Sequence, residues 1–120
     1  MIRPTGRATA RIAMTAALLF AAGAHAHSDQ ERTEPADGAM VAGVETMTIR
    51  FDAPMRVTAI KLMRDGREMD VARETGMEPV TEFRAAPAEP LAPGAYAVEW
   101  RGLSADGHPM QGAFGFTVSE

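Results

Sequence analysis

The sequence predicts an all-β domain of the sandwich or barrel type, preceded by an N-terminal export signal. Three observations support this prediction. Short stretches of alternating apolar and polar residues recur through the chain, and turn-forming glycines and prolines separate them. After the first 26 residues, no segment shows a convincing helical period. Several short strands in about a hundred residues are typical of a sandwich or a barrel.

The first 26 residues have the composition of a secretory signal. Three arginines and no acidic residue lie within the first 11 positions, residues 12–22 are apolar, and Ala24-His25-Ala26 is a small-x-small cleavage site. We expect residues 1–26 to be removed and residues 27–120 to form one periplasmic domain. A membrane anchor is the alternative, but the apolar run is shorter than the roughly 20 residues that a membrane span needs.

The charge and the sulfur content narrow the class of protein. The whole chain carries a formal net charge of −4, and loss of the three leader arginines makes it −7. This acidic balance argues against nucleic acid and against anionic membrane surfaces, and it favours cation binding. The chain has no cysteine, so it forms no disulfide and offers methionine as its only sulfur ligand.

Two strands are expected in the first half of the domain. Apolar residues alternate with polar ones from Met47 to Phe51, and Ala53-Pro54 is expected to end this strand. Ile60 and Leu62 mark a second strand, which the Asp65-Gly66 turn signal closes. Residues 67–79 are charged and weakly patterned, as in a loop or an edge strand.

The second half holds the clearest pattern. Residues 80–86 are a candidate strand, and the prolines and glycine of residues 87–94 form a stiff connection. The last two strands are expected to point large apolar side chains into the core: Tyr96, Val98, Trp100, Phe114, Phe116 and Val118.

The histidines suggest a metal site. The chain has three, namely His25 and His27 at the cleavage site and His108 in the loop Asp106-Gly107-His108-Pro109. A cut after Ala26 makes His27 the first residue, so that its α-amine and ring nitrogen can chelate one metal. With Asp106 and His108 this gives three nitrogens and one oxygen, a donor set that suits tetragonal copper(II). We therefore expect one copper(II) per chain, bound by His27, Asp106 and His108.

Two other interpretations stay open at this point. Asp-Gly-His-Pro is a common turn composition, so the domain can also be a metal-free sandwich that mediates protein contacts. A cut after Ala24 would instead leave His25-Ala26-His27 at the terminus. That tripeptide binds copper(II) through its amine, two amides and an imidazole, and it needs neither Asp106 nor His108.

Nearly the whole mature chain resembles the CopC-like periplasmic copper-binding proteins. The segments that carry the resemblance are residues 35–39, 49–55, 93–101 and 104–109, with Gly112 and Phe116-Thr117-Val118. The resemblance implies a seven-stranded Greek-key β-sandwich of immunoglobulin-like or cupredoxin-like type. It also implies a copper(II) site formed by the N-terminal histidine and the Asp-x-His pair, which correspond to His27, Asp106 and His108.

The same resemblance implies a function. It points to a copper carrier or buffer in copper resistance and homeostasis, with an inner-membrane copper importer as the usual partner. Neither nucleic acid binding nor membrane insertion of the mature chain is expected.

The chain departs from the family pattern at two places. Many relatives carry a glutamate near the copper(II), whereas the matching positions here are Asp52 and Ala53. Some relatives hold copper(I) in a methionine-rich loop with a histidine. Here Met63, Met69 and Met77 are widely spaced and no histidine accompanies them, so we expect weak copper(I) binding.

A copper enzyme is the remaining rival. Copper monooxygenases that act on polysaccharides also hold their metal with an N-terminal histidine and a second histidine. The domain is small, and its aromatic residues are expected in the core rather than on a flat sugar-binding face. The carboxylate of Asp106 would also occupy a position that oxygen chemistry needs open, so we expect a protein that is not an enzyme.

Overall fold

The computed structural model describes residues 31–120, which form eight β-strands. The predicted signal peptide, His25 and His27 lie outside the described residues. The strands are β1 (Arg32–Glu34), β2 (Ala39–Val41), β3 (Met47–Arg64), β4 (Arg67–Met69), β5 (Val71–Arg73), β6 (Val80–Pro87), β7 (Gly94–Ser104) and β8 (Pro109–Val118). Residues 31–120 contain no helix, and hence none that is long and apolar enough to cross a membrane. The all-β prediction is confirmed.

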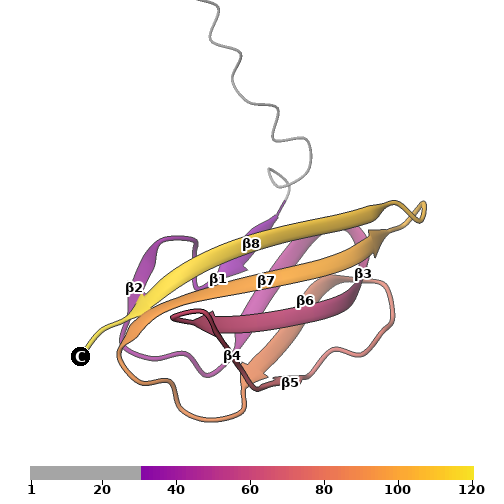
Figure 1. Cartoon of the computed structure of the whole chain (residues 1–120). Coiled ribbons are helices and arrows are strands. Elements are labelled where there is room, and N and C mark those ends of the chain that lie inside the picture. Colours follow the sequence, from indigo (N-terminus) through magenta and orange to yellow (C-terminus); the bar gives the residue numbers. More distant parts are fainter. Residues whose placement is uncertain (1–30) are drawn as a thin grey trace, which may run out of the picture.

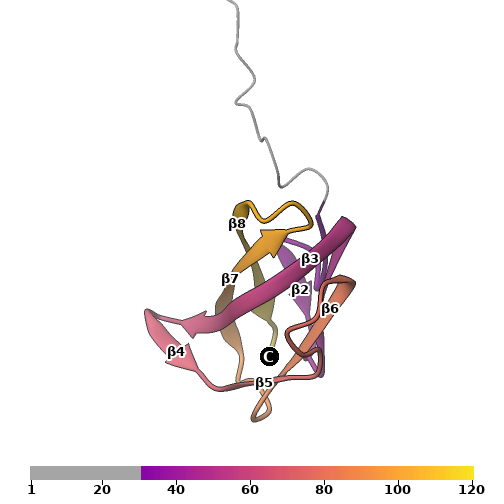
Figure 2. The same cartoon turned by 90° about the vertical axis from the view of Figure 1, so that its right-hand side faces the viewer.

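The strands form one hydrogen-bonded network that curls into two layers (Figure 1). The strand order is β2-β8-β7-β3-β6-β5, and β1 and β4 also pair with β3. The first part of β3 pairs with β1 and β6, and its second part pairs with β4 and β7. The long strand β3 therefore belongs to both layers and connects them, as Figure 2 shows from the side.

Two details of the predicted strand plan are corrected. The strand that begins at Met47 does not end at Ala53-Pro54 but continues to Arg64. Pro54 is tolerated because the ladder between β3 and β6 shifts register between Arg50 and Met55, so no ladder bond there needs its missing N–H. The structure also has eight strands rather than seven, since it includes three-residue strands that are too short to show an alternating pattern.

The predicted hairpin turn after Leu62 is confirmed. Asp65 and Gly66 both have positive φ values, 49° and 77°, as a tight two-residue hairpin between β3 and β4 requires. Residues 67–79, expected as a loop or edge strand, hold the short strands β4 and β5. The candidate strand at residues 80–86 corresponds to β6.

The core lies between the two layers. Its buried apolar residues are Met47, Ile49, Met55, Val57, Leu62, Phe83, Ala85, Tyr96, Val98, Trp100, Phe114, Phe116 and Val118. The predicted inward positions of β7 and β8 are confirmed, while Phe51 and Ile60 are only partly buried against this core. The Phe51 ring meets the Trp100 ring edge-on, with 5.1 Å between the centroids.

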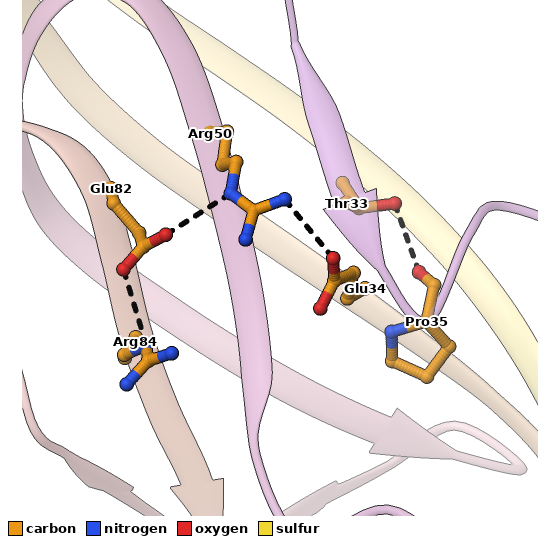
Figure 3. A network of polar contacts seen from close by, with 6 residues as sticks. All are labelled: Thr33, Glu34, Pro35, Arg50, Glu82 and Arg84. Atoms are coloured by element: carbon orange, nitrogen blue, oxygen red, sulfur yellow. Dashed lines mark hydrogen bonds and ion pairs between the residues drawn. The ribbon is translucent and has the colours of Figure 1, made fainter.

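The first strand is fastened to the sheet by an exposed ion-pair network (Figure 3). Arg50 Nη1 lies 3.1 Å from Glu34 Oε1, and Arg50 Nε lies 3.0 Å from Glu82 Oε1. The hydrogen bond from Arg50 to Glu82, followed by the charge of Glu34, raises the pKa of the Arg50 guanidinium. A single exposed ion pair contributes little to stability. The network links three strands, β1, β3 and β6.

Candidate metal site

The loop between β7 and β8 is a compact turn held by its own backbone. The Ser104 N–H donates to the His108 carbonyl at 2.9 Å, and the Gly107 N–H donates to the Ser104 carbonyl at 2.9 Å. Gly107 has a φ of 84°, which a side chain would strain, so a glycine at this position allows the loop to turn. The turn holds residues 105–108 at the tip of the longest hairpin.

Within this turn, Asp106 and His108 contact each other directly. The distance between His108 Nδ1 and Asp106 Oδ2 is 2.8 Å. The Ser104 hydroxyl donates to the other carboxylate oxygen, Oδ1, and also accepts from the His108 N–H at 3.1 Å. Both side chains remain accessible, with exposed fractions of 74% for His108 and 68% for Asp106. The predicted pair of donors is therefore brought together at the surface.

These hydrogen bonds shift both pKa values. The bond from the Ser104 hydroxyl, followed by the one from His108, lowers the pKa of the Asp106 carboxyl from 3.8 to about 2. The bond to Asp106, followed by the charge of that carboxylate, raises the pKa of the His108 imidazole above 6.5. The carboxylate is thus ionised at all ordinary pH values, and the imidazole holds its proton more tightly than a free one.

The arrangement suits a metal-binding histidine. Because Nδ1 faces Asp106, the other ring nitrogen, Nε2, is the one directed away from the pair. Metal-ligating histidines commonly donate their second ring N–H to a carboxylate, which orients the ring and raises its basicity. Each oxygen of the Asp106 carboxylate accepts one hydrogen bond and retains a second lone pair that can bind a metal.

The described residues do not complete a site by themselves. No group of three or more His, Cys, Asp or Glu side chains within residues 31–120 is arranged to hold a metal ion. Two of the three predicted ligands, Asp106 and His108, are adjacent. The third, His27, lies outside the described residues.

The direction of β1 relates this strand to the β7–β8 turn. β1 runs antiparallel to β3, with Arg32 opposite Arg50 and Glu34 opposite Thr48. The N-terminal end of β1 therefore lies on the side of the bend of β3, where Met55 pairs with Ser104 at the base of the β7–β8 turn. The N-terminal end of β1 accordingly points toward the end of the sandwich that carries the β7–β8 turn (Figure 1).

The two departures noted in the sequence also have a structural setting. Asp52 and Ala53 have no pairing partner in the β3–β6 ladder and lie at the exposed bend of β3.

The three methionines do not share a surface. Met69 sits opposite Leu62 and packs on the core, Met63 points to the other face of the same ribbon, and Met77 is an exposed loop residue.

Sequence reasoning assigned no role to two groups near the turn. The first is Ser104, whose hydroxyl bonds to Asp106 and to the His108 N–H. The Ser-x-Asp spacing could have indicated this role, because serine and aspartate side chains commonly form hydrogen bonds within such turns. The second is Glu31, whose Oε1 accepts a hydrogen bond from Trp100 Nε1 at 3.1 Å. The two residues are 69 positions apart, so no local pattern could have indicated this bond.

Comparison with known proteins agrees with the fold. Residues 30–119 match the CopC domain family. The chain is 30% identical to copper resistance protein C of Xanthomonas campestris pv. juglandis over 121 residues, which covers 89% of this chain and 91% of that protein. It is 38% identical to copper resistance protein C of Escherichia coli over 77 residues, which covers 62% of this chain and 60% of that protein.

Solved structures give the same result. The fold superposes on PcoC, a copper resistance protein from Escherichia coli, with a TM-score of 0.61 and 28% identity, covering 73% of this chain and 96% of that one. CopC from Methylosinus trichosporium OB3b gives a TM-score of 0.63 and 25% identity, covering 72% and 88%. These are β-sandwich proteins of one class, and the chain belongs to the CopC family.

Proposed function

We propose that this protein is a periplasmic copper(II) carrier or buffer that serves copper resistance and homeostasis. The observation that carries the proposal is the 2.8 Å contact between Asp106 and His108. The pair is exposed on the β7–β8 turn, at the end of the sandwich toward which the N-terminal end of β1 points. The relatives named copper resistance protein C and the likeness to PcoC support copper as the cargo.

In this proposal, one copper(II) is bound by His27, Asp106 and His108. Signal peptidase removes residues 1–26, and the new terminus supplies the α-amine and the ring nitrogen of His27. His108 contributes an imidazole nitrogen, and Asp106 contributes an oxygen whose negative charge partly offsets that of the ion. Three nitrogens and one oxygen match the preference of copper(II) for tetragonal coordination.

The exposure of the pair favours a carrier over an enzyme. Cargo must be handed on, and both Asp106 and His108 are accessible to a partner such as an inner-membrane copper importer. The aromatic rings of Tyr96, Trp100, Phe114 and Phe116 are buried, so within residues 31–120 they form no flat face for a polysaccharide.

The test is a copper(II) titration of the exported protein, after mass measurement has identified its first residue. We expect one equivalent to bind to the chain that begins at His27. A form with one extra residue before His27 should bind far more weakly, because the α-amine then becomes an amide. Equal affinity of the two forms would contradict the proposal, as would a mature chain that binds no copper(II).

A further inference from the structure

We infer that Glu31 is a positioning residue, which holds the N-terminal end of β1 against Trp100 and so keeps the chain terminus near the Asp106–His108 turn. The inference rests on the proposed function. It adds a residue that would not itself bind the metal, and it explains how the chain terminus is directed to a turn that is remote in the sequence.

The first step is the contact itself. Trp100 Nε1 donates to Glu31 Oε1 at 3.1 Å, and Glu31 is partly buried where the bond forms. The indole belongs to the core, with only 3% of Trp100 exposed, and the Phe51 ring packs against it edge-on. Glu31 is therefore attached to one of the most firmly held side chains of the domain.

The second step is the space that the contact requires. Gly112 lies opposite Trp100 in the β7–β8 ladder. A Cβ atom at Gly112 would lie 2.5 Å from Trp100 Nε1 and 2.8 Å from Glu31 Oε2. Any side chain at this position would displace the carboxylate or the indole. The missing side chain of Gly112 thus leaves room for Glu31 on the same hairpin that carries the turn.

The third step is the reach of the chain. The ladder pair Trp100–Gly112 is three residues from the last pair, Leu103–Pro109, a distance of roughly 10 Å at the rise of a β-strand. His27 precedes Glu31 by four residues, which can span at most about 14 Å. An anchor at Glu31 thus leaves just enough chain for His27 to meet the turn.

Loss of the anchor would lengthen the free segment. Without the bond to Trp100, this side-chain tether between Glu31 and the hairpin is lost, and the pairing of β1 with β3 begins one residue later, at Arg32. A longer and less directed tether lowers the effective concentration of the terminal amine at His108. Loss of the Glu31 anchor should therefore weaken copper(II) binding when the α-amine of His27 is free, and only then.

The experiment uses the exported chain in four versions. They combine Glu31 or Glu31→Ala with a free His27 terminus or with one extra glycine ahead of it. We expect Glu31→Ala to weaken copper(II) binding about tenfold in the free-terminus form, as for loss of one hydrogen bond to a charged group. In the extended form the same substitution should change affinity by less than about twofold. Equal losses in both forms, or no loss in the first, would overturn the inference.

Glu34→Ala is the matched control. It removes the same charge three residues farther along the chain, within β1, and breaks the ion pair with Arg50, but it leaves the contact with Trp100 intact. We expect it to change copper(II) affinity by less than about twofold, since exposed ion pairs contribute little. If Glu34→Ala weakened binding as much as Glu31→Ala, general loosening of β1 would explain the effect and the inference would fail.

A copper-free measurement tests the contact directly. Trp100 is the only tryptophan in the chain, so its indole N–H gives a single NMR resonance. We expect slow hydrogen exchange of this proton in the wild type and in Glu31→Gln, which retains an acceptor oxygen, and faster exchange in Glu31→Ala. Identical exchange in the wild type and Glu31→Ala would overturn the inference even if copper binding were as proposed.

The two proposals fail in different ways. If His108→Ala and the extra glycine leave copper(II) affinity unchanged, the proposed site is wrong, and the positioning role falls with it. If both changes weaken binding while Glu31→Ala does not, only the role of Glu31 is wrong.

Discussion

The imidazole of His108 and the carboxylate of Asp106 are joined by a 2.8 Å contact between Nδ1 and Oδ2, on a turn that leaves both groups largely exposed. The Ser104 hydroxyl holds the opposite oxygen of the same carboxylate. Exposed side chains usually sample several rotamers. Here these two bonds, together with the one from the His108 N–H to the Ser104 hydroxyl, restrict the pair in the absence of metal, which reduces the ordering cost of binding.

The first prediction concerns Asp106 and His108, the two proposed ligands that lie within the described residues. His108→Ala should weaken copper(II) binding by at least about 100-fold, above the 10–100-fold range typical of groups that only orient a ligand. Asp106→Ala should weaken it less, because all three nitrogens remain. Isothermal titration with a competing chelator measures both. A His108→Ala variant with wild-type affinity would exclude the site.

The second prediction is the pH dependence of copper(II) binding. The metal competes with protons for the α-amine and two imidazoles, whose ordinary pKa values are near ~7.8 and ~6.5. Affinity should therefore fall from pH 8 to pH 5, and the slope of log affinity should steepen from about one proton to about three. The raised pKa of His108 makes its share of this loss begin at a higher pH than for a free imidazole.

The matching control is Asp106→Asn, which removes the charge that raises the pKa of His108. An NMR titration of His108 in this variant should show a pKa closer to 6.5. A binding slope that stays flat between pH 5 and 8 would mean that neither amine nor imidazole holds the metal. A slope steeper than three protons would instead favour the His25-Ala26-His27 terminus, where two amide protons must also leave.

The third prediction concerns the stability of the copper-free protein. The lowered pKa of Asp106 stabilises the fold above pH 3.8, and this contribution is lost as the pH falls toward about 2. The raised pKa of His108 stabilises the fold below pH 6.5, and this contribution is lost as the pH rises through the folded-state value. Asp106→Asn should thus lower the melting temperature most between about pH 4 and 6.5. An equal decrease at pH 8 and pH 5 would contradict this.

The fourth prediction is that copper(I) binds weakly and independently of copper(II). Met63 and Met69 point to opposite faces of the β3–β4 ribbon, and Met77 lies in a separate exposed loop. The triple variant Met63→Leu, Met69→Leu, Met77→Leu should therefore retain wild-type copper(II) affinity. Competition with a copper(I) chelator should show little difference from the wild type. A tight copper(I) complex that the triple variant loses would refute the prediction.

The fifth prediction separates folding from binding. Leu62 is fully buried in β3, far along the sheet from the turn at Asp106 and His108. Leu62→Ala should lower the free energy of unfolding by about 2–5 kcal/mol and leave copper(II) affinity unchanged while the protein is folded. Lys61→Ala, an exposed neighbour, should stay within about 0.5 kcal/mol of the wild type. Denaturant unfolding measures the free energy of unfolding, and copper titration at the same temperature measures the affinity. A folded Leu62→Ala variant with weakened copper(II) binding would contradict the prediction.

The local patterns of the chain were sufficient to predict the all-β class, the Asp65-Gly66 hairpin and the inward faces of β7 and β8. Each depends on residues only a few positions apart, since alternation and turn chemistry are short-range effects. The same holds for the turn at Gly107, where Asp106 and His108 can meet because only one residue separates them.

Tertiary structure decided the features that depend on distant pairing. β3 continues through Pro54 because its ladder with β6 is interrupted there. The three-residue strands each form by pairing with a longer strand. The bond between Glu31 and Trp100 joins residues 69 positions apart, across space that Gly112 leaves open. Such contacts form because burial of the whole core brings the strands together, and no window of sequence contains both partners.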